Sequence, residues 1–481
     1  MPVTQAQIAF RSNPSRYAFA GAAKLINAYT EQQGNDAKGP LAVLPRPGLV
    51  GCCDVTDTPG RGNIFLDDLD CGYAVHSSGV FKYTLVTLSP FVVTATRIGT
   101  VPGTDQVQMS RNQADPVQIS MSCDAGQYYI QADVVKKVDS DLFTTEPVTA
   151  EQVGGYTVYG EENGRFDFSA LQDCNSVDAL DFATAEQYAD KLTAIKADGP
   201  DMFVFSRTSV EPWRVVADTD LPFQLIGGAV SKKGLVAKHA VISSDNTLMF
   251  PGEDNIAYRF QGYNPTRIST HGIERYFEAD GDRENILGLS YSFEGHSLAC
   301  WTGDAYTVAF DAATQSWHNC ESYQNGGKWR WRNAVRAWGK TVVQDSLSGG
   351  LFYFDKDAYD EDGDPLIWGM DTPFVHAVGG NGGIVDSLHI DFVTGGGALN
   401  DDDEGYDPKL MLSWSVDGGN TFKGNRELSL GQRGHYLTKV RTGRLGKFGD
   451  KGIMFRLRVS DPVPRGIVAI TPSIRPLKLQ R

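Results

Sequence analysis

Short apolar runs separated by polar reversals recur along most of this 481-residue chain, and they limit its fold more than any other feature. Residues 74–88, 117–135, 156–168 and 239–250 each contain an apolar run, a reversal rich in Ser, Asp, Asn or Gly, and a second apolar run. This arrangement is typical of β-hairpins. We therefore predict an all-β protein with only a few short helices.

Two segments show helical features instead. Residues 18–31 lead to a stop at Gly34. Residues 184–197 place apolar side chains at helical spacing, with Thr184 three residues before Gln187 as a capping box. We predict a helix in each segment.

The span 262–355 indicates radial repetition of four-stranded units. Hairpins that end in an aromatic residue followed by aspartate recur, as at Phe310-Asp311 and Phe354-Asp355. Such repetition is typical of a β-propeller. The period is too irregular to count the blades, and six is a guess.

The acidic turn 355–365 and the glycine cluster 379–383 interrupt this pattern and mark a boundary. We predict three parts: residues 1–40 form an N-terminal segment with a short helix, residues 41–383 form the propeller, and residues 384–481 form a C-terminal β-domain resembling a sandwich or a barrel. A β/α region near residues 75–200 is a possible insertion in the propeller.

The stretch 410–422 combines a strand with a turn of recognisable chemistry. Apolar residues alternate from Leu410 to Val416, as in a half-buried strand, and the chain then reverses. Ser415, Asp417, Gly419 and Thr421 fit the Asp-box pattern of sialidase-like propellers. Glycoside hydrolysis requires two carboxylates, or a tyrosine nucleophile beside arginines, and an Asp box supplies neither. A structural turn is favoured over a catalytic one, and we predict no catalytic residue.

Two clusters contain side chains of the kinds that bind metals. The pairs His296/Cys300 and His318/Cys320 have even spacing, so adjacent strands could bring them together around zinc. A buried structural role is the favoured alternative. The aspartates between residues 355 and 364 lack the spacing of a calcium-binding EF-hand loop. We therefore predict neither a metal nor a cofactor.

Aromatic and arginine side chains alternate from Trp329 to Arg332, and Arg336 and Trp338 follow. Such a run could stack on nucleic acid. The favoured alternative is that the tryptophans pack between sheets while the arginines face solvent.

Seven cysteines, without a Cys-x-x-Cys pair, indicate reduced thiols. No apolar run approaches the roughly 18 to 20 residues that cross a bilayer, so we expect synthesis in the cytoplasm and no membrane insertion by this chain.

The charge is divided unevenly along the chain. Residues 409–481 contain 15 Lys and Arg against 4 Asp and Glu, a net charge of +11, so residues 1–408 carry −26 of the total of −15. A basic domain on an acidic body favours weak, non-specific proximity to DNA over tight binding. The alternative is that these charges only keep the protein soluble.

Several short blocks occur in an order that resembles a known family. They are Asn27-x-Tyr29-x-Glu31, Pro47-Gly48-Leu49, Gly262 to Thr270 with Arg267 and Ser269, Ile273-Glu274, Glu294-Gly295-His296, Phe310-Asp311 to Trp317-His318, Leu412 to Gly419, Leu445-Gly446, and Phe455 to Pro462. Together they resemble the packaged-DNA-stabilising tail hub, or nozzle, proteins of short-tailed bacteriophages (podoviruses). Asn319-Cys320 departs from the family pattern after Trp317-His318.

The resemblance implies a non-enzymatic virion protein with a β-propeller and additional β-domains, made in the bacterial host cytoplasm. Such hubs form a ring, generally a homohexamer, below the portal and its adaptor ring. They retain the packaged double-stranded DNA, continue the ejection channel, and carry tail fibres or spikes and a distal needle or plug. A sialidase-like phage glycosidase and a receptor-binding tail adhesin are the alternatives.

The resemblance suggests two sets of functional residues. The blade motif comprises Gly262, Arg267, Ser269, Gly295, His296, Asp311 and Trp317. If the ring closes by pairing acidic blade edges with a neighbour's basic C-terminal face, then Lys447, Lys451, Arg456 and Arg458 are candidate interface or channel residues.

Overall fold

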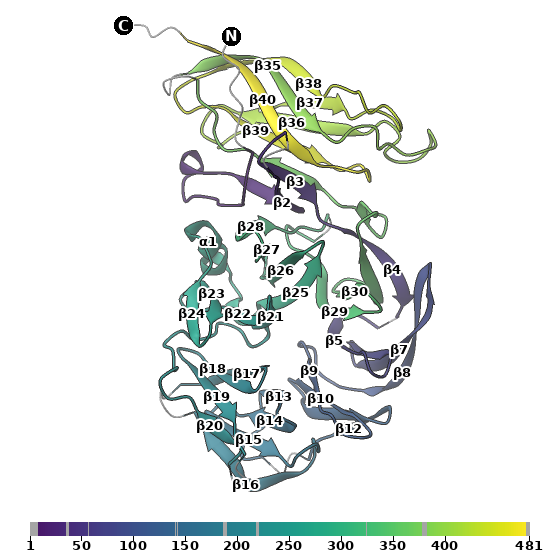
Figure 1. Ribbon diagram of the computed structural model, residues 1–481, viewed down its shortest axis with the longest axis vertical. Coiled ribbons are helices and arrows are strands. Elements are labelled where there is room, and N and C mark those ends of the chain that lie inside the picture. Colours follow the sequence, from purple (N-terminus) through teal and green to yellow (C-terminus); the bar gives the residue numbers. More distant parts are fainter. Residues whose placement is uncertain are drawn as a thin grey trace.

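The computed structural model describes residues 8–34, 38–55, 57–139, 141, 143–185, 190–217, 221–323, 325–377 and 382–477. About 53% of the chain is strand and 4% is helix. The strands form a β-propeller with a β-sandwich at one end of it, at the top of Figure 1. The predicted all-β fold is therefore confirmed, as are the propeller and the additional β-domain.

Within the described residues, the propeller has seven blades of four strands rather than the six that we guessed. Six blades use consecutive strands: β5 (Gly60–Leu66), β6 (Cys71–His76), β7 (Gly79–Leu88) and β8 (Phe91–Thr100); β9 (Gln108–Arg111), β10 (Gln118–Cys123), β11 (Gly126–Gln131) and β12 (Val134–Lys137); β13 (Thr149–Val153), β14 (Tyr156–Gly160), β15 (Arg165–Ser169) and β16 (Val177–Thr184); β17 (Leu192–Asp198), β18 (Asp201–Ser206), β19 (Val210–Val215) and β20 (Phe223–Leu225); β21 (Ile242–Ser244), β22 (Thr247–Pro251), β23 (Ala257–Gln261) and β24 (Asn264–Arg267); β25 (Leu287–Phe293), β26 (His296–Thr302), β27 (Thr307–Asp311) and β28 (Ser316–Asn319).

The seventh blade joins the two ends of the propeller sequence. It contains β29 (Trp331–Ala337), β30 (Lys340–Asp345) and β31 (Gly350–Asp355), and its fourth strand is β4 (Gly48–Asp54), which precedes the first blade in the chain. The short strands β32 (Asp360–Glu361) and β33 (Asp364–Pro365) extend this sheet. Strand β29 packs against β5 of the first blade, and the pairing of β31 with β4 closes the ring of blades.

The sandwich is built from two sheets around one apolar core. One sheet has the order β2 (Ala28–Gln32), β3 (Leu41–Pro45), β40 (Ile467–Pro476), β35 (Gly383–Phe392) and β38 (Arg441–Phe448). The other contains β34 (Trp368–Asp371), β39 (Met454–Val459), β36 (Lys409–Ser415) and β37 (Lys423–Ser429). Strand β1 (Lys24–Ile26) pairs with both β28 and β34, and it thereby joins this sheet to the sixth blade.

The predicted helix at residues 18–31 is wrong. Only the 3-10 turn η1 (Ala18–Ala20) is helical there, and β1 and β2 follow it. Leu25 and Ala28 are buried in the sandwich core, so pairing with distant strands overrides the local helical pattern. Asn27 lies between β1 and β2. Its side-chain amide donates to the backbone carbonyls of Glu321 (2.8 Å) and Ile367 (2.9 Å), and these bonds link the N-terminal strands to both domains.

The predicted helix at residues 184–197 is also wrong. Strand β16 ends at Thr184 and β17 begins at Leu192, while residues 186–189 lie outside the described part of the chain. Leu192 and Ile195 are buried in the core between blades as strand residues. Short helical segments occur elsewhere, at α1 (His271–Ala279), η3 (Lys238–Ala240) and η4 (Arg283–Asn285). No helix in the described residues is long and apolar enough to cross a membrane.

The sheets do not follow the predicted division at residues 40 and 383. Strands β2 and β3, on either side of residue 40, pair with each other and, through β3, with β40 in the sandwich. At the second boundary, β34 lies before residue 383 but pairs with β39. The described residues between 75 and 200 contribute strands to the first four blades, and residues 379–381 of the glycine cluster lie outside the described chain.

Candidate functional site

The Asp417 turn is held by a dense set of hydrogen bonds. One carboxylate oxygen accepts from the Ser415 hydroxyl at 2.7 Å and from the Asn420 amide at 3.1 Å. The other accepts from the Thr421 hydroxyl at 2.6 Å, and the Thr421 amide lies 3.0 Å from both oxygens. The Gly419 amide donates to the Ser415 hydroxyl at 2.9 Å. All four predicted motif residues therefore meet in one turn, with the contacts of a structural element.

These hydrogen bonds, first of all that from the Thr421 hydroxyl, lower the pKa of Asp417 well below its usual value. A carboxyl whose pKa is depressed on folding adds stability above its unfolded pKa, and this stability is lost as the pH falls through the folded pKa. We expect Asp417→Asn to lower the melting temperature at pH 7, and the difference from wild type to shrink below about pH 4. Melting curves from pH 7 to pH 3 measure this, and equal melting temperatures at pH 7 would refute the structural role.

The first half of the predicted blade motif anchors α1 to the fifth blade. The Arg267 guanidinium donates to both oxygens of Glu274 in α1, at 2.8 Å each. The Ser269 hydroxyl donates to Glu274 at 2.7 Å and accepts from the Ala257 amide at 3.0 Å. Gly262, with a φ of +61°, occupies the turn between β23 and β24, where a side chain would be strained.

The second half of the motif stabilises the sixth blade. The His296 imidazole pairs with the buried carboxylate of Asp311 at 2.7 Å, and this hydrogen bond raises the pKa of His296. Asp311 also accepts from the Thr314 hydroxyl at 2.7 Å. Trp317 is 1% exposed, and its indole donates to the Ile268 carbonyl at 2.9 Å. Gly295, with a φ of +86°, lies in the turn that precedes His296.

The four candidate basic residues fall into two groups. Arg456 and Arg458 of β39 both pair with Asp371 of β34, at 2.9 and 2.7 Å. Both arginines are therefore directed toward a carboxylate of the neighbouring strand, which makes them poor candidates for an interface. Lys447 and Lys451 are exposed and form no ion pair with the described residues.

The possible zinc ligands do not form a metal centre. His296 is paired with Asp311, and His318 is buried with no hydrogen-bond partner among the described residues for either ring nitrogen. Cys300 and Cys320 lie in the apolar core between the sixth and seventh blades. Within the described residues, no three His, Cys, Asp or Glu side chains are grouped so as to hold a metal ion.

The alternating tryptophans and arginines have mainly structural contacts. Trp329 and Trp331 are buried, and both indoles donate to the carboxylate of Glu361, at 3.0 and 2.8 Å. Arg330 donates to Asp345 at 2.9 Å and to Asp364 at 2.8 Å. Arg332 forms no ion pair with the described carboxylates and, together with Trp329 and Trp331, lines a cavity at the centre of the propeller.

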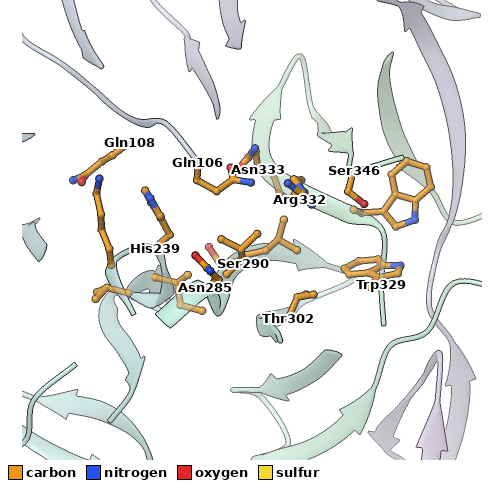
Figure 2. A pocket seen from close by; sticks show the side chains of 18 of the residues that line it. Gln106, Gln108, His239, Asn285, Ser290, Thr302, Trp329, Arg332, Asn333 and Ser346 are labelled. Carbon is orange, nitrogen blue, oxygen red and sulfur yellow. The ribbon is translucent and has the colours of Figure 1, made fainter. Parts of the chain in front are cut away.

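This cavity has a volume of about 520 Å³, and the sequence did not suggest it. Its walls come from β5, β9, β17, η3, β21, β25 and β29, which are the inner parts of six blades. Figure 2 shows Gln106, His239 and Arg332 around the same space, with Asn285 and Ser290 below them. A second cavity of about 430 Å³ shares six of these wall residues, which are Gln106, Lys238, His239, Asn285, Leu287 and Arg332.

Two family descriptions match the chain, one for each domain. "Bacteriophage P22 Gp10, beta-propeller" matches residues 55–359, and "Bacteriophage P22 Gp10, beta-sandwich" matches residues 367–473. The protein is therefore a structural protein of a bacteriophage tail, with a propeller joined to a sandwich. It belongs to the bacteriophage P22 Gp10 family, whose members stabilise packaged DNA.

Two of the solved structures that match show distant likeness to the chain. The WD40 beta-propeller domain of Doa1 is 9% identical, with a TM-score of 0.42 over 64% of this chain and 95% of that chain. The extracellular domain of a one-component system from B. thetaiotaomicron is 11% identical, with a TM-score of 0.41 over 73% of this chain and 45% of that chain. No curated protein matches the sequence.

Proposed function

We propose that this protein is the tail hub, or nozzle, of a short-tailed bacteriophage. Copies of the chain form a ring, a homohexamer, below the portal and its adaptor ring. The ring retains packaged DNA by weak non-specific contact, continues the ejection channel, and anchors tail fibres or spikes and a distal needle or plug. The family match carries this proposal, because it includes both the propeller and the sandwich.

The charge distribution supports ring assembly through unlike surfaces. A ring closes when one face of each copy binds a different face of the next, and complementary charge helps to orient such contacts. Residues 1–408 carry −26 and residues 409–481 carry +11. Arg456 and Arg458 are paired internally with Asp371. We therefore assign the proposed contact with the acidic blade edges of the neighbouring copy to Lys447 and Lys451.

Reversing the charge of these two lysines should weaken the ring. We expect the double variant Lys447→Glu/Lys451→Glu to fold normally but to shift from the ring toward the monomer, because each contact between copies then places like charges together. Native mass spectrometry at low and high salt measures this shift. The matched control is Lys137→Glu/Lys356→Glu, two exposed lysines of the propeller. If Lys447→Glu/Lys451→Glu assembles as the wild type does at both salt concentrations, the proposed interface through these two lysines is wrong.

The position in the virion is tested by binding. The purified protein should bind particles whose portal carries the adaptor ring, and it should not bind particles that lack the adaptor. Equal binding to both kinds of particle would contradict a place below the adaptor. Attachment of the purified protein directly to bacteria would favour a receptor-binding adhesin instead.

A further inference from the structure

Arg332 is a partly buried arginine without a carboxylate partner. The Asp345 carboxylate favours the charged form of Arg332. However, Asp345 is already bound by Arg330 at 2.9 Å and by the backbone amide of Leu347 at 3.0 Å. No carboxylate among the described residues forms an ion pair with Arg332. When the Gln106 amide is oriented to satisfy its neighbours, its oxygen accepts from Nη1 of Arg332 at 2.9 Å. Burial lowers the pKa of Arg332, because desolvation disfavours the charged guanidinium more than the Asp345 carboxylate favours it.

Lys238 and His239 line the same cavity from η3. The Lys238 ammonium is 4.0 Å from the Asp105 carboxylate, and the His239 imidazole is 3.9 Å from it. Both distances exceed a hydrogen bond, and Nε2 of His239 has no hydrogen-bond partner among the described residues. Burial lowers the pKa of both side chains, because desolvation disfavours their charged forms more than the Asp105 carboxylate favours them.

The other charges around these residues are largely balanced. Arg61 lies between Asp105 and Asp124, at 3.7 and 3.6 Å, so Arg61 and Lys238 together face two carboxylates. Lys196 pairs with Glu151 at 2.9 Å. The remaining charged wall residues are Lys328, Asp282 and Asp304. Of the wall cations, Arg332 and Lys328 form no ion pair with a carboxylate of the described residues.

We propose that this central cavity binds a small oxyanion of the phosphate class, held between Arg332 on one wall and Lys238 and His239 on another. The planar guanidinium offers paired donors that match a phosphate, and the ammonium adds a point charge. Asn285, Ser290 and Asn333 add polar side chains to the wall, so the bound oxygens have further hydrogen-bond partners. A volume of about 520 Å³ admits either free phosphate or a nucleotide phosphate.

Calorimetric titration of the purified full-length protein with inorganic phosphate, at constant ionic strength, tests the site. We expect saturable binding of one phosphate per chain. Arg332→Gln should weaken it by about tenfold or more, because a charge-assisted contact is lost. The matched control is Arg336→Gln, since Arg336 lies on the same strand β29 but is exposed. Titration with dAMP identifies the source: tighter binding than phosphate indicates a nucleotide, and equal or weaker binding indicates the free ion.

A second variant and a second measurement keep the test decisive if Arg332→Gln does not fold. Lys238→Gln, on the other wall, should also weaken phosphate binding, and about 10 mM phosphate should raise the melting temperature of the wild type. The proposal is overturned if the wild type shows neither saturable heat nor a higher melting temperature. It is equally overturned if the folded Arg332 and Lys238 variants bind phosphate as the wild type does.

Discussion

Replacement of Trp317 by alanine is expected to destabilise the propeller by about 3–5 kcal/mol, the usual cost of removing a large aromatic side chain from a core. The side chain is 1% exposed and packs against Trp301 and Phe310, with ring centroids 5.7 and 5.2 Å away. It also packs in the core that contains Ile273 and Phe277 of α1. The substitution would leave a cavity between the fifth and sixth blades and free the Ile268 carbonyl.

Urea unfolding followed by tyrosine and tryptophan fluorescence measures this loss. Tyr436→Ala removes an aromatic side chain that is 71% exposed, so it should change stability by no more than about 0.5 kcal/mol. If Trp317→Ala were as mild as this control, then Trp317 would not hold the blades together as the contacts indicate.

Replacement of Asp371 by alanine is expected to destabilise the sandwich by about 3 kcal/mol, because it leaves two arginines without their shared carboxylate. The Asp371 side chain is 4% exposed, whereas those of Arg456 and Arg458 are 36% and 19% exposed. This value is at the lower end of the range that is usual for removing one partner of a buried ion pair, because solvent partly screens Arg456. The same pair of contacts joins β34 to β39, so the loss should also loosen the strand that follows the propeller.

Thermal unfolding of Asp371→Ala, monitored by circular dichroism, checks this expectation. Glu162→Ala breaks an ion pair with Lys191 that is exposed on both sides, at 58% and 73%, and should have little effect. A melting temperature for Asp371→Ala equal to that of the Glu162 variant would show that the two arginines do not depend on Asp371.

Local sequence patterns predicted those parts of the fold that depend on contacts between residues close together in the chain. The alternation from Leu410 to Val416 corresponds to β36, and Ser415, Asp417 and Thr421 make their turn within a few residues. The helical pattern at residues 18–31 failed because β1 pairs with β28 and β34, hundreds of residues away, and β2 pairs with β3, which in turn pairs with β40. The count of blades failed for the same reason, because β4 reaches the seventh blade from the other end of the propeller.

The same distinction applies to the candidate sites. The sequence proposes Arg456 and Arg458 as interface residues, but it cannot reveal that Asp371 of β34 lies opposite Arg456. Nor does any motif join Arg332 to Lys238 and His239. These residues line the same cavity only because the blades close into a ring around it.

Electron cryomicroscopy of tailed particles is the most direct test of the proposed tail hub. We predict a six-fold ring below the portal and adaptor, in which each subunit fits the propeller of residues 48–365 and the sandwich built from β1–β3 and β34–β40. A single copy at the tip of a fibre or spike, or tail density below the adaptor that cannot hold this pair of domains, would contradict the proposal.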